Sequence, residues 1–232
     1  MAATVRLLVI APTTRELGGL RPCADRACRA AAVGVGHEAA PAFATLLDAE
    51  RPSAVLSLGF AGGLRPGLST GALALCDAAL GEGAAPIALD PYPAVDALRA
   101  AGIAAASSVL LTVDEPLLTP EAKHAAHAAS GAAVVDMEGY ALACVARERG
   151  VPIVALRAVL DAAEHALPPF VADIVADGGR GELRHTLRNL RADPPLILRL
   201  PMLAWRSRVA ARALRRGVRA LIPALAAHAE AR

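Results

Sequence analysis

Two short apolar runs constrain the fold most, because both lead into acidic side chains. The β-branched run Ala132–Val135 leads into Glu138. A helix expected over Tyr140–Arg149 separates it from a second run, Ile153–Ala158, which leads into Asp161. In an open α/β sheet, ligands bind at the edge formed by the carboxyl ends of the strands. The chain is therefore expected to fold around such a sheet and to carry two carboxylates at its binding edge.

The rest of the chain alternates between strand-like and helix-like segments, which is the pattern of an α/β domain. Apolar or alternating runs predict further strands at Val5–Ile10, Ala54–Leu58, Gly71–Cys76 and Ala104–Leu111. Helical patterns predict further helices at Ala39–Ala49, Val95–Ala101 and Glu121–Ala129. At 232 residues the chain is long enough for one domain with a large core, and no internal repeat is visible.

The composition excludes several classes of protein. Hydrophobic residues make up 55% of the chain but aromatic residues only 3%, and charge, glycine or proline interrupts each apolar run before about 18 residues. No segment is therefore expected to cross a membrane, and the first run is too short for a secretion signal, so we expect a cytoplasmic protein. The four cysteines form no CxxC pair and lack a nearby histidine set, and we expect neither a metal nor another cofactor.

Charge is distributed unevenly along the chain, although the net charge is only +2. Residues 1–179 hold 12 basic and 19 acidic side chains, whereas residues 180–232 hold 12 basic and 3 acidic side chains. Four prolines are expected to divide the helical tail, namely Pro194, Pro195, Pro201 and Pro223. We therefore expect a main α/β domain over residues 1–180 and an Arg-rich helical extension over residues 181–232.

Within the tail, the segment Met202–Leu221 predicts a basic amphipathic helix. Apolar residues recur at helical spacing at Leu203, Ala210, Leu214, Val218 and Leu221, and a parallel stripe is formed by Arg208, Arg212, Arg215 and Arg219. Such a helix can pack on the core as a solvated C-terminal helix. It can also lie on an anionic membrane surface, with Leu203, Trp205 and Leu214 toward the lipid. Since aromatic residues do not alternate with the arginines, we expect no nucleic-acid partner.

Two earlier segments follow predicted strands and are candidates for the same site. Glu16 lies just beyond the first strand, where a carboxylate in a partly dry pocket can act as a general base on water. A lone glutamate there is more often a helix N-terminal carboxylate that the helix dipole favours. The glycine-rich segment Gly59–Gly63 lets backbone N–H groups approach an anion or a planar ring, but it can equally be a tight turn after a strand.

The acidic residues after the two opening runs have similar alternatives. A carboxylate at Glu138 suits bidentate hydrogen bonding to a vicinal diol, and Met137 offers an apolar surface to a sugar face. Taken singly, they can also be a capping carboxylate and a core methionine. Asp161 could give a proton to a leaving heterocycle if its pKa is raised, whereas a lone aspartate in that place is as often a helix cap.

Three segments together resemble the signature segments of the nucleoside phosphorylase and nucleosidase superfamily. They are Val135–Ala141, Leu58–Leu64 and Leu156–Ala162, in the family's order and spacing, and the resemblance spans most of residues 5–165. The turn Pro12–Leu17 is similar to that of the methylthioadenosine/S-adenosylhomocysteine nucleosidase branch. The resemblance implies a phosphorylase/hydrolase-like fold, which is a three-layer α/β/α sandwich around a mixed central sheet. It also implies a homodimer or a larger assembly.

The resemblance further implies roles for single residues. Asp161 would protonate N7 of a purine, and Glu16 would position a water nucleophile. Glu138 and Met137 would bind the ribose, and Arg157 would belong to the substrate-binding set by ordering its segment. The remaining substrate-binding residues would be Phe60, Ala61, Gly62, Pro116 and Leu117, the last two in a loop that holds the base plane.

Departures from the family pattern concern the nucleophile and the acid. Members that use phosphate carry an arginine where this chain has Ser57 and a serine where it has Phe60, which favours water as the nucleophile. An anion site could still assemble from Thr13, Thr14, Arg15 and Ser57. The serine that usually precedes the catalytic aspartate is Leu160 here, so a neighbouring hydroxyl that would orient Asp161 is missing.

The function implied is cleavage of the N-glycosidic bond of a 5′-substituted adenosine, with release of adenine. The ending of the chain resembles the hopanoid-associated phosphorylase-like branch, which implies adenosylhopane as a lipid-linked substrate in hopanoid biosynthesis. It also implies peripheral contact with the inner face of the membrane through residues 202–221. The alternatives are a phosphate-dependent purine nucleoside phosphorylase, a soluble methylthioadenosine/S-adenosylhomocysteine nucleosidase, and a membrane- or nucleic-acid-binding adaptor on a degenerate enzyme fold.

Overall fold

A mixed sheet of eight strands forms the centre of the computed structural model, which describes residues 6–18, 28–169, 171–172 and 200–230. The strands are β1 (Leu7–Ala11), β2 (Cys28–Ala32), β3 (Ala54–Gly63), β4 (Leu73–Gly81), β5 (Ile87–Ala88), β6 (Ala105–Thr112), β7 (Val134–Asp136) and β8 (Ile153–Asp161). The helices are α1 (Thr14–Leu17), α2 (Ala39–Glu50), α3 (Ala94–Ala100), α4 (Pro120–Ser130), α5 (Gly139–Glu148) and α8 (Leu200–Glu230), with a short 3-10 helix η1 (Gly36–Glu38).

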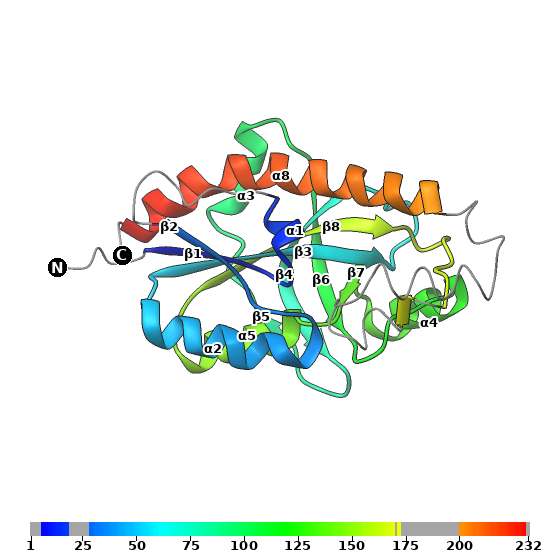
Figure 1. The fold of residues 1–232 in the computed structure, drawn as a ribbon, viewed down its shortest axis with the longest axis horizontal. Coiled ribbons are helices and arrows are strands. Elements are labelled where there is room, and N and C mark those ends of the chain that lie inside the picture. The colour runs from blue at the N-terminus through cyan, green and yellow to red at the C-terminus, as the bar shows by residue number, and fades with distance from the viewer. Residues whose placement is uncertain (1–5, 19–27, 170, 173–199, 231–232) are drawn as a thin grey trace.

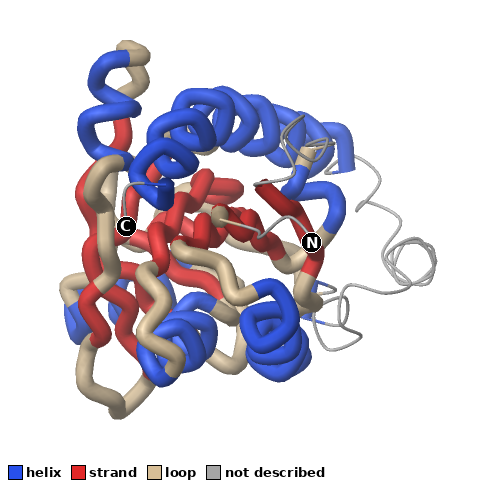
Figure 2. The backbone as a smooth tube through the Cα atoms, turned by 90° about the vertical axis from the view of Figure 1, so that its left-hand side faces the viewer, coloured by secondary structure: helices blue, strands red, loops and turns tan. Residues whose placement is uncertain are grey.

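Helices cover both faces of the sheet (Figure 1, Figure 2). α3 and α8 lie over one face, and α2 and α5 lie over the other. Successive side chains of β1 point to opposite faces of the sheet. Leu7 and Val9 join the core beneath α8, whereas Leu8 and Ile10 join the core beneath α2 and α5. The predicted α/β sandwich around a mixed sheet, with a helical C-terminal extension, is confirmed.

Five of the strands close into a ring. β3 pairs with β8, β8 with β4, β4 with β6, β6 with β7, and β7 again with β3. β1 pairs with the first half of β3, on the edge that β7 uses at the end of the strand; β2 pairs with β1, and β5 pairs with β4. The ring was not predicted, and it is what assembles the site: Gly62 of β3 is paired with Val135 of β7 and with Asp161 of β8.

Strand β3 continues through the glycine-rich segment Gly59–Gly63, beyond its predicted end at Leu58. The interpretation of this segment as a tight turn after a strand is therefore wrong. Its backbone is paired with β8 and, at its end, with β7, and this pairing offsets the low strand propensity of glycine. A register shift between Ala61 and Gly62 marks a bulge at the point where the strand borders the cavity described below.

The helix α8 is continuous over 31 residues and passes through Pro223, which was expected to divide it. Pro223 is exposed, whereas Leu221 and Leu225 on either side of it are buried in the core. Packing of this apolar face holds the helix in place across the missing backbone donor. The predicted boundary at residue 180 lies outside the described residues, as do Pro194 and Pro195.

The inner face of α8 contains Leu214, which is only 1% exposed, so the prediction that this side chain faces lipid is wrong. Arg215, assigned to the basic stripe, lies against Gly18 at the end of α1. The exposed side chains of the outer face include Met202, Trp205, Arg208, Arg212, Arg216 and Arg219. In the part of the chain that the structure describes, no helix is both long and apolar enough to cross a membrane.

Candidate active site

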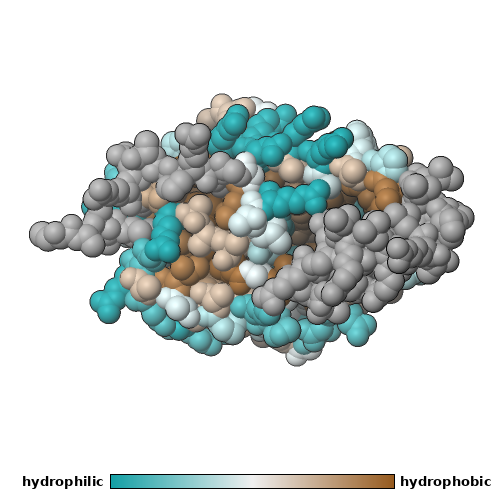
Figure 3. Space-filling view, viewed as in Figure 1, coloured by the Kyte–Doolittle hydropathy of each residue, from teal (hydrophilic) through white to brown (hydrophobic). Residues whose placement is uncertain are grey.

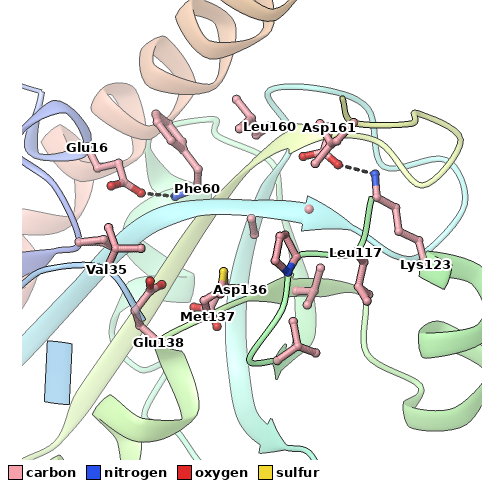
Figure 4. Close-up of a pocket in the computed structure, with 17 residues that line it drawn as sticks. Glu16, Val35, Phe60, Leu117, Lys123, Asp136, Met137, Glu138, Leu160 and Asp161 are labelled. Atoms are coloured by element: carbon pink, nitrogen blue, oxygen red, sulfur yellow. Dashed lines mark hydrogen bonds and ion pairs between the residues drawn. The ribbon is translucent and has the colours of Figure 1, made fainter. Parts of the chain in front are cut away.

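Side chains from the ends of β1, β3, β7 and β8 and from the loops beside them line a cavity of about 210 Å³ (Figure 4). Among the residues predicted for the site, those lining it are Glu16, Phe60, Ala61, Gly62, Pro116, Leu117, Met137, Glu138 and Asp161. The other lining residues are Pro12, Val35, Val113, Lys123, Val135, Asp136, Leu160 and Leu167. Segments far apart in the sequence thus meet at one edge of the sheet.

Glu16 caps the first turn of α1 and also lines the cavity. It is the third residue of α1, where it forms a capping box: its Oε2 accepts hydrogen bonds from Thr13 N at 3.1 Å and Thr13 Oγ1 at 2.7 Å. Its Oε1 accepts a hydrogen bond from Phe60 N at 2.8 Å, at the edge of the cavity. Burial raises the pKa of Glu16, and the hydrogen bonds from Thr13 and Phe60 offset part of that rise.

Glu138 stands at the N-cap position of α5, but its side chain does not cap the helix. Its Oε1 accepts a hydrogen bond from Gly36 N at 2.7 Å, which turns the carboxylate toward the cavity. The cap is supplied by Asp136, whose Oδ1 and Oδ2 accept from Gly139 N at 3.0 and 3.1 Å. Burial, together with the nearby carboxylate of Asp136, raises the pKa of Glu138 to about 7.

Arg157 is fully buried and lies outside the cavity lining. Its guanidinium pairs with Asp136 at 2.9 Å and donates to Ser57 O at 3.1 Å and Ser57 Oγ at 3.2 Å. A β-carbon on Gly139 would lie 2.8 Å from Asp136 Oδ2, so glycine leaves room for this carboxylate. The pair therefore fixes β3, β7 and β8 relative to one another beneath the site.

Asp161 ends β8 and is paired with Lys123 of α4, and both side chains are buried. Lys123 Nζ also donates to Ala162 O at 3.1 Å and His165 O at 2.7 Å. Burial raises the pKa of Asp161, and the ammonium group of Lys123 opposes that rise. Leu160, next to the acid, lines the cavity with an apolar side chain that has no hydrogen-bonding group.

Four carboxylates line the cavity, and the three predicted from the sequence, Glu16, Glu138 and Asp161, lie in different places around it (Figure 4). Glu16 and Glu138 lie at one end, and Asp161 with Lys123 lies at the other. Apolar side chains cover the space between them and beyond, including Phe60, Val113, Pro116, Leu117, Leu160 and Leu167. The arrangement can hold a planar apolar group near one acid and a polar group between the two glutamates.

The four residues considered for an anion site do not line the cavity. Thr13 is engaged with Glu16, Arg15 donates to Ser207 Oγ of α8 at 2.6 Å, and Ser57 interacts with Arg157. The side chain of Thr14 is exposed at the surface of α1. In the structure these groups point to different neighbours.

Lys123 was missed, because helix α4 was predicted without any functional residue. A signal was nevertheless present in the sequence: Lys123 is the only lysine among 24 basic Lys and Arg residues. All the remaining 23 of these residues are arginines, and the side chain of the one lysine is almost fully buried. Buried lysines are rare unless paired, so this choice indicates a specific role.

Comparison with known proteins gives a family and a fold. A family model described as "Phosphorylase superfamily" matches residues 26–185. No curated protein sequence matches the chain.

Among solved structures, futalosine hydrolase of Helicobacter pylori is similar with a TM-score of 0.66 and 17% identity, over 93% of this chain and 97% of that chain. The 5′-methylthioadenosine/S-adenosylhomocysteine nucleosidase of Neisseria meningitidis, in complex with methylthio-immucillin-A, is similar with a TM-score of 0.66 and 19% identity, over 92% of this chain and 98% of that chain. At sequence identities this low, the structural similarity shows that the chain shares the fold of these proteins.

Proposed function

The chain belongs to the phosphorylase superfamily, and we propose that it cleaves the N-glycosidic bond of a 5′-substituted adenosine and releases adenine. The family resemblance inferred from the sequence is thereby confirmed, and the reaction is inferred from the site. The observation that carries the proposal is that Glu16, Glu138 and Asp161 line one cavity from different sides. This is the set of groups needed for a water nucleophile, a diol and a leaving base.

Asp161 is proposed as the general acid. A purine leaves more readily when N7 is protonated, because the electron pair of the breaking bond then forms a neutral base. Burial keeps a proton on Asp161 to a higher pH than usual, and the apolar loop residues Val113, Pro116 and Leu117 fit the flat face of a base. Adenine would therefore lie at the end of the cavity that contains Asp161.

Glu138 and Glu16 are proposed to act on the sugar side. Glu138 would accept hydrogen bonds from the ribose hydroxyls, with the half-buried Met137 against the sugar face. Glu16 would take a proton from the water that attacks C1′, and its two hydrogen-bonded oxygens fix the direction from which the water is held. The proton balance closes, since water gives one proton to Glu16 and the base receives one from Asp161.

Water is the proposed nucleophile. A phosphate group needs several donors that converge on it, and the side chains of Thr13, Arg15 and Ser57 are directed to Glu16, Ser207 and Arg157 instead. The phosphate-dependent phosphorylase is the alternative reaction on the same site.

An assay of adenine release tests the function and the nucleophile together. The purified protein is incubated with 5′-methylthioadenosine, S-adenosylhomocysteine and a lipid-linked adenosine, each with and without phosphate, in water enriched in ¹⁸O. We expect adenine together with a free sugar that carries ¹⁸O at C1, whether or not phosphate is present. A sugar 1-phosphate would identify a phosphorylase, and no adenine from any nucleoside would reject the proposed reaction and favour the adaptor.

A pH dependence is expected from Glu138. Below about pH 7 this carboxyl keeps its proton and can no longer accept from both ribose hydroxyls, so kcat/KM should rise as the pH rises through about 7. In Glu138→Gln the side chain does not titrate, and this rise should disappear together with most of the activity. Profiles of kcat/KM from pH 5 to 9 check this, with Glu148→Gln on the surface of α5 as the control.

The same substitution should stabilise the protein at high pH. The folded state holds a proton on Glu138 up to about pH 7, whereas the unfolded chain loses it near its ordinary pKa of 4.5. The buried charge therefore costs stability above about pH 7, and the cost vanishes as the pH falls toward 4.5. Glu138→Gln should raise the free energy of unfolding by up to about 3 kcal/mol at pH 8 and by almost nothing at pH 4.5. Urea unfolding at both pH values measures the difference.

For the substrate itself, we propose a lipid-linked adenosine such as adenosylhopane, which the protein would reach by lying on the inner face of a membrane. What supports this is the outer face of α8, where Met202 and Trp205 are exposed beside a row of exposed arginines. Figure 3 shows hydrophilic side chains along the upper edge of this view, over α8. A soluble methylthioadenosine/S-adenosylhomocysteine nucleosidase is the alternative, and a homodimer or larger assembly is proposed from the family resemblance.

Membrane contact is best tested with point variants. Deleting residues 202–232 would remove Leu214, Val218, Leu221 and Leu225 from the core, at about 2 kcal/mol for each buried side chain, and would unfold the protein. Reversing Arg208, Arg212 and Arg216 to glutamate changes only exposed groups. Each arginine near an anionic surface contributes about 1 kcal/mol, so binding to phosphatidylglycerol vesicles should fall at least about 100-fold.

The matched control is Arg147→Glu, an exposed arginine of α5, which covers the other face of the sheet. Vesicle sedimentation at low and high salt measures the effect, and binding of the unaltered protein should weaken with salt. Equal binding of the triple variant and the control would reject membrane contact through α8.

A further inference from the structure

The only lysine of the chain, Lys123, lies at the proposed site. Lys123 is 1% exposed and belongs to the cavity lining, although the side chains on either side of it in α4 are more accessible. α4 is well defined at its beginning, because Thr119 caps it and Pro120 occupies its first turn. The helix thus delivers one cation to the interior at a fixed place.

The contacts of Lys123 match the shape of an ammonium group. Its three donors meet one carboxylate oxygen, Asp161 Oδ2, and two backbone carbonyls, Ala162 O and His165 O. A planar guanidinium presents its donors in a rigid fork and does not suit three acceptors gathered around one point. The need for this geometry explains why a chain otherwise rich in arginine has a lysine here.

The pairing treats the two oxygens of Asp161 differently. Oδ2 is held by Lys123, whereas Oδ1 accepts no hydrogen bond from any of the described residues. The loop after β8 is held by the same cation, and Leu167 N donates to Leu118 O at 2.8 Å just before α4. One oxygen of the acid is therefore anchored, and the other is left for a ligand in the cavity.

We infer that Lys123 is a positioning residue for the acid: it orients Asp161 and stabilises the carboxylate that remains when Asp161 gives its proton to the leaving base. The inference rests on the proposed function. As the bond between C1′ and N9 breaks, its electron pair goes to the base, and the proton moves from Asp161 Oδ1 to N7. The new carboxylate lies against the ammonium group, which keeps its three protons.

Two opposing effects then set the strength of the acid. Burial favours the protonated form of Asp161, and the charge of Lys123 opposes this effect. In a dry cavity the attraction between ammonium and carboxylate is larger than it is in water. Lys123 thus lowers the barrier to proton transfer through its effect on Asp161.

The first test compares Lys123→Met with the control His124→Met, an exposed position one residue further along α4. Adenine release from 5′-methylthioadenosine should fall about 10- to 100-fold in kcat in Lys123→Met, with KM within about threefold, which is less than the loss of the acid itself. The alkaline limb of the pH profile of kcat should move to higher pH, because Asp161 gives up its proton less readily without the cation.

A substrate methylated at N7 separates proton transfer from a general loss of structure. Its base leaves without needing a proton, so Lys123→Met should cleave it within about threefold of the unaltered protein. An equal loss on both substrates, or an alkaline limb that does not move, would overturn the inference. The comparison has meaning only when the unaltered protein releases adenine, so failure of the proposed function is seen separately.

A second measurement uses the unaltered protein, so it can be made even if Lys123→Met does not fold. Because the chain has a single lysine, labelling with lysine enriched in ¹⁵N at Nζ gives one ammonium signal from the unaltered protein. We expect that signal to be visible at neutral pH, since buried N–H groups exchange slowly, and to shift when Asp161 titrates. Ammonium protons that exchange as fast as those of a free lysine, with a signal that does not shift when Asp161 titrates, would contradict the pairing on which the inference depends.

Discussion

Asp161→Asn is expected to lower kcat for adenine release by about 10²- to 10⁴-fold, because an amide cannot give a proton to N7. The same change should lower the free energy of unfolding by up to about 3 kcal/mol where Asp161 is ionised, since Lys123 then remains buried without its carboxylate. Stopped assays of adenine release and urea unfolding at pH 7 measure the two effects. Activity within tenfold of the unaltered protein would remove Asp161 from the mechanism.

The double variant Asp161→Asn with Lys123→Met separates the two effects. Removing both charges leaves no unpaired ion in the core, so stability should return to within about 1–2 kcal/mol of the unaltered protein. Activity should not return, because no acid is present. Recovery of stability without activity would show that the loss of turnover in Asp161→Asn is chemical and does not result from unfolding.

Glu16→Gln is expected to lower the rate of hydrolysis by about 10²- to 10⁴-fold, because glutamine cannot take a proton from water. Glutamine is also accepted in the capping box of α1, so we expect a stability loss of only about 1 kcal/mol. Binding of adenine, which lies toward Asp161 in the proposed arrangement, should change less than threefold. Calorimetric titration with adenine and the hydrolysis assay check both expectations.

Assaying Glu16→Gln with and without phosphate distinguishes a hydrolase from a phosphorylase. A phosphate dianion needs no base to attack C1′, so a phosphorylase would tolerate Glu16→Gln when phosphate is supplied. Full activity of the variant in phosphate, with none in its absence, would contradict water as the nucleophile. Loss of activity under both conditions would agree with Glu16 as the base.

Much of the fold could be predicted because the relevant signals are local. The apolar runs that became β1, β6 and β8 and the helical patterns that became α2 and α5 are readable from periodicity alone. β2 and β5 were not predicted, because one is rich in alanine and the other has only two residues. The ring of strands depends on pairing between residues far apart in sequence, which periodicity does not report.

The site could be predicted only in part for a related reason. Glu16, Glu138 and Asp161 follow strands, and motifs mark them, so their meeting in one cavity agrees with the sequence. The partners that define their chemistry lie elsewhere: Gly36 holds Glu138, and Lys123 holds Asp161. A buried cation on a helix without a motif becomes recognisable when the only lysine in the chain is treated as informative.

The closed ring of strands also determines the stage of folding at which the site forms. β8 lies between β3 and β4, so the ring needs residues 153–161 to pair with partners about a hundred and about eighty residues earlier in the chain. Such distant pairings carry a large loop-closure entropy and form late. Because Gly62, Val135 and Asp161 meet only at this junction, the cavity arises together with global folding, and a nascent chain that ends before β8 has no partly formed site that could bind a nucleoside.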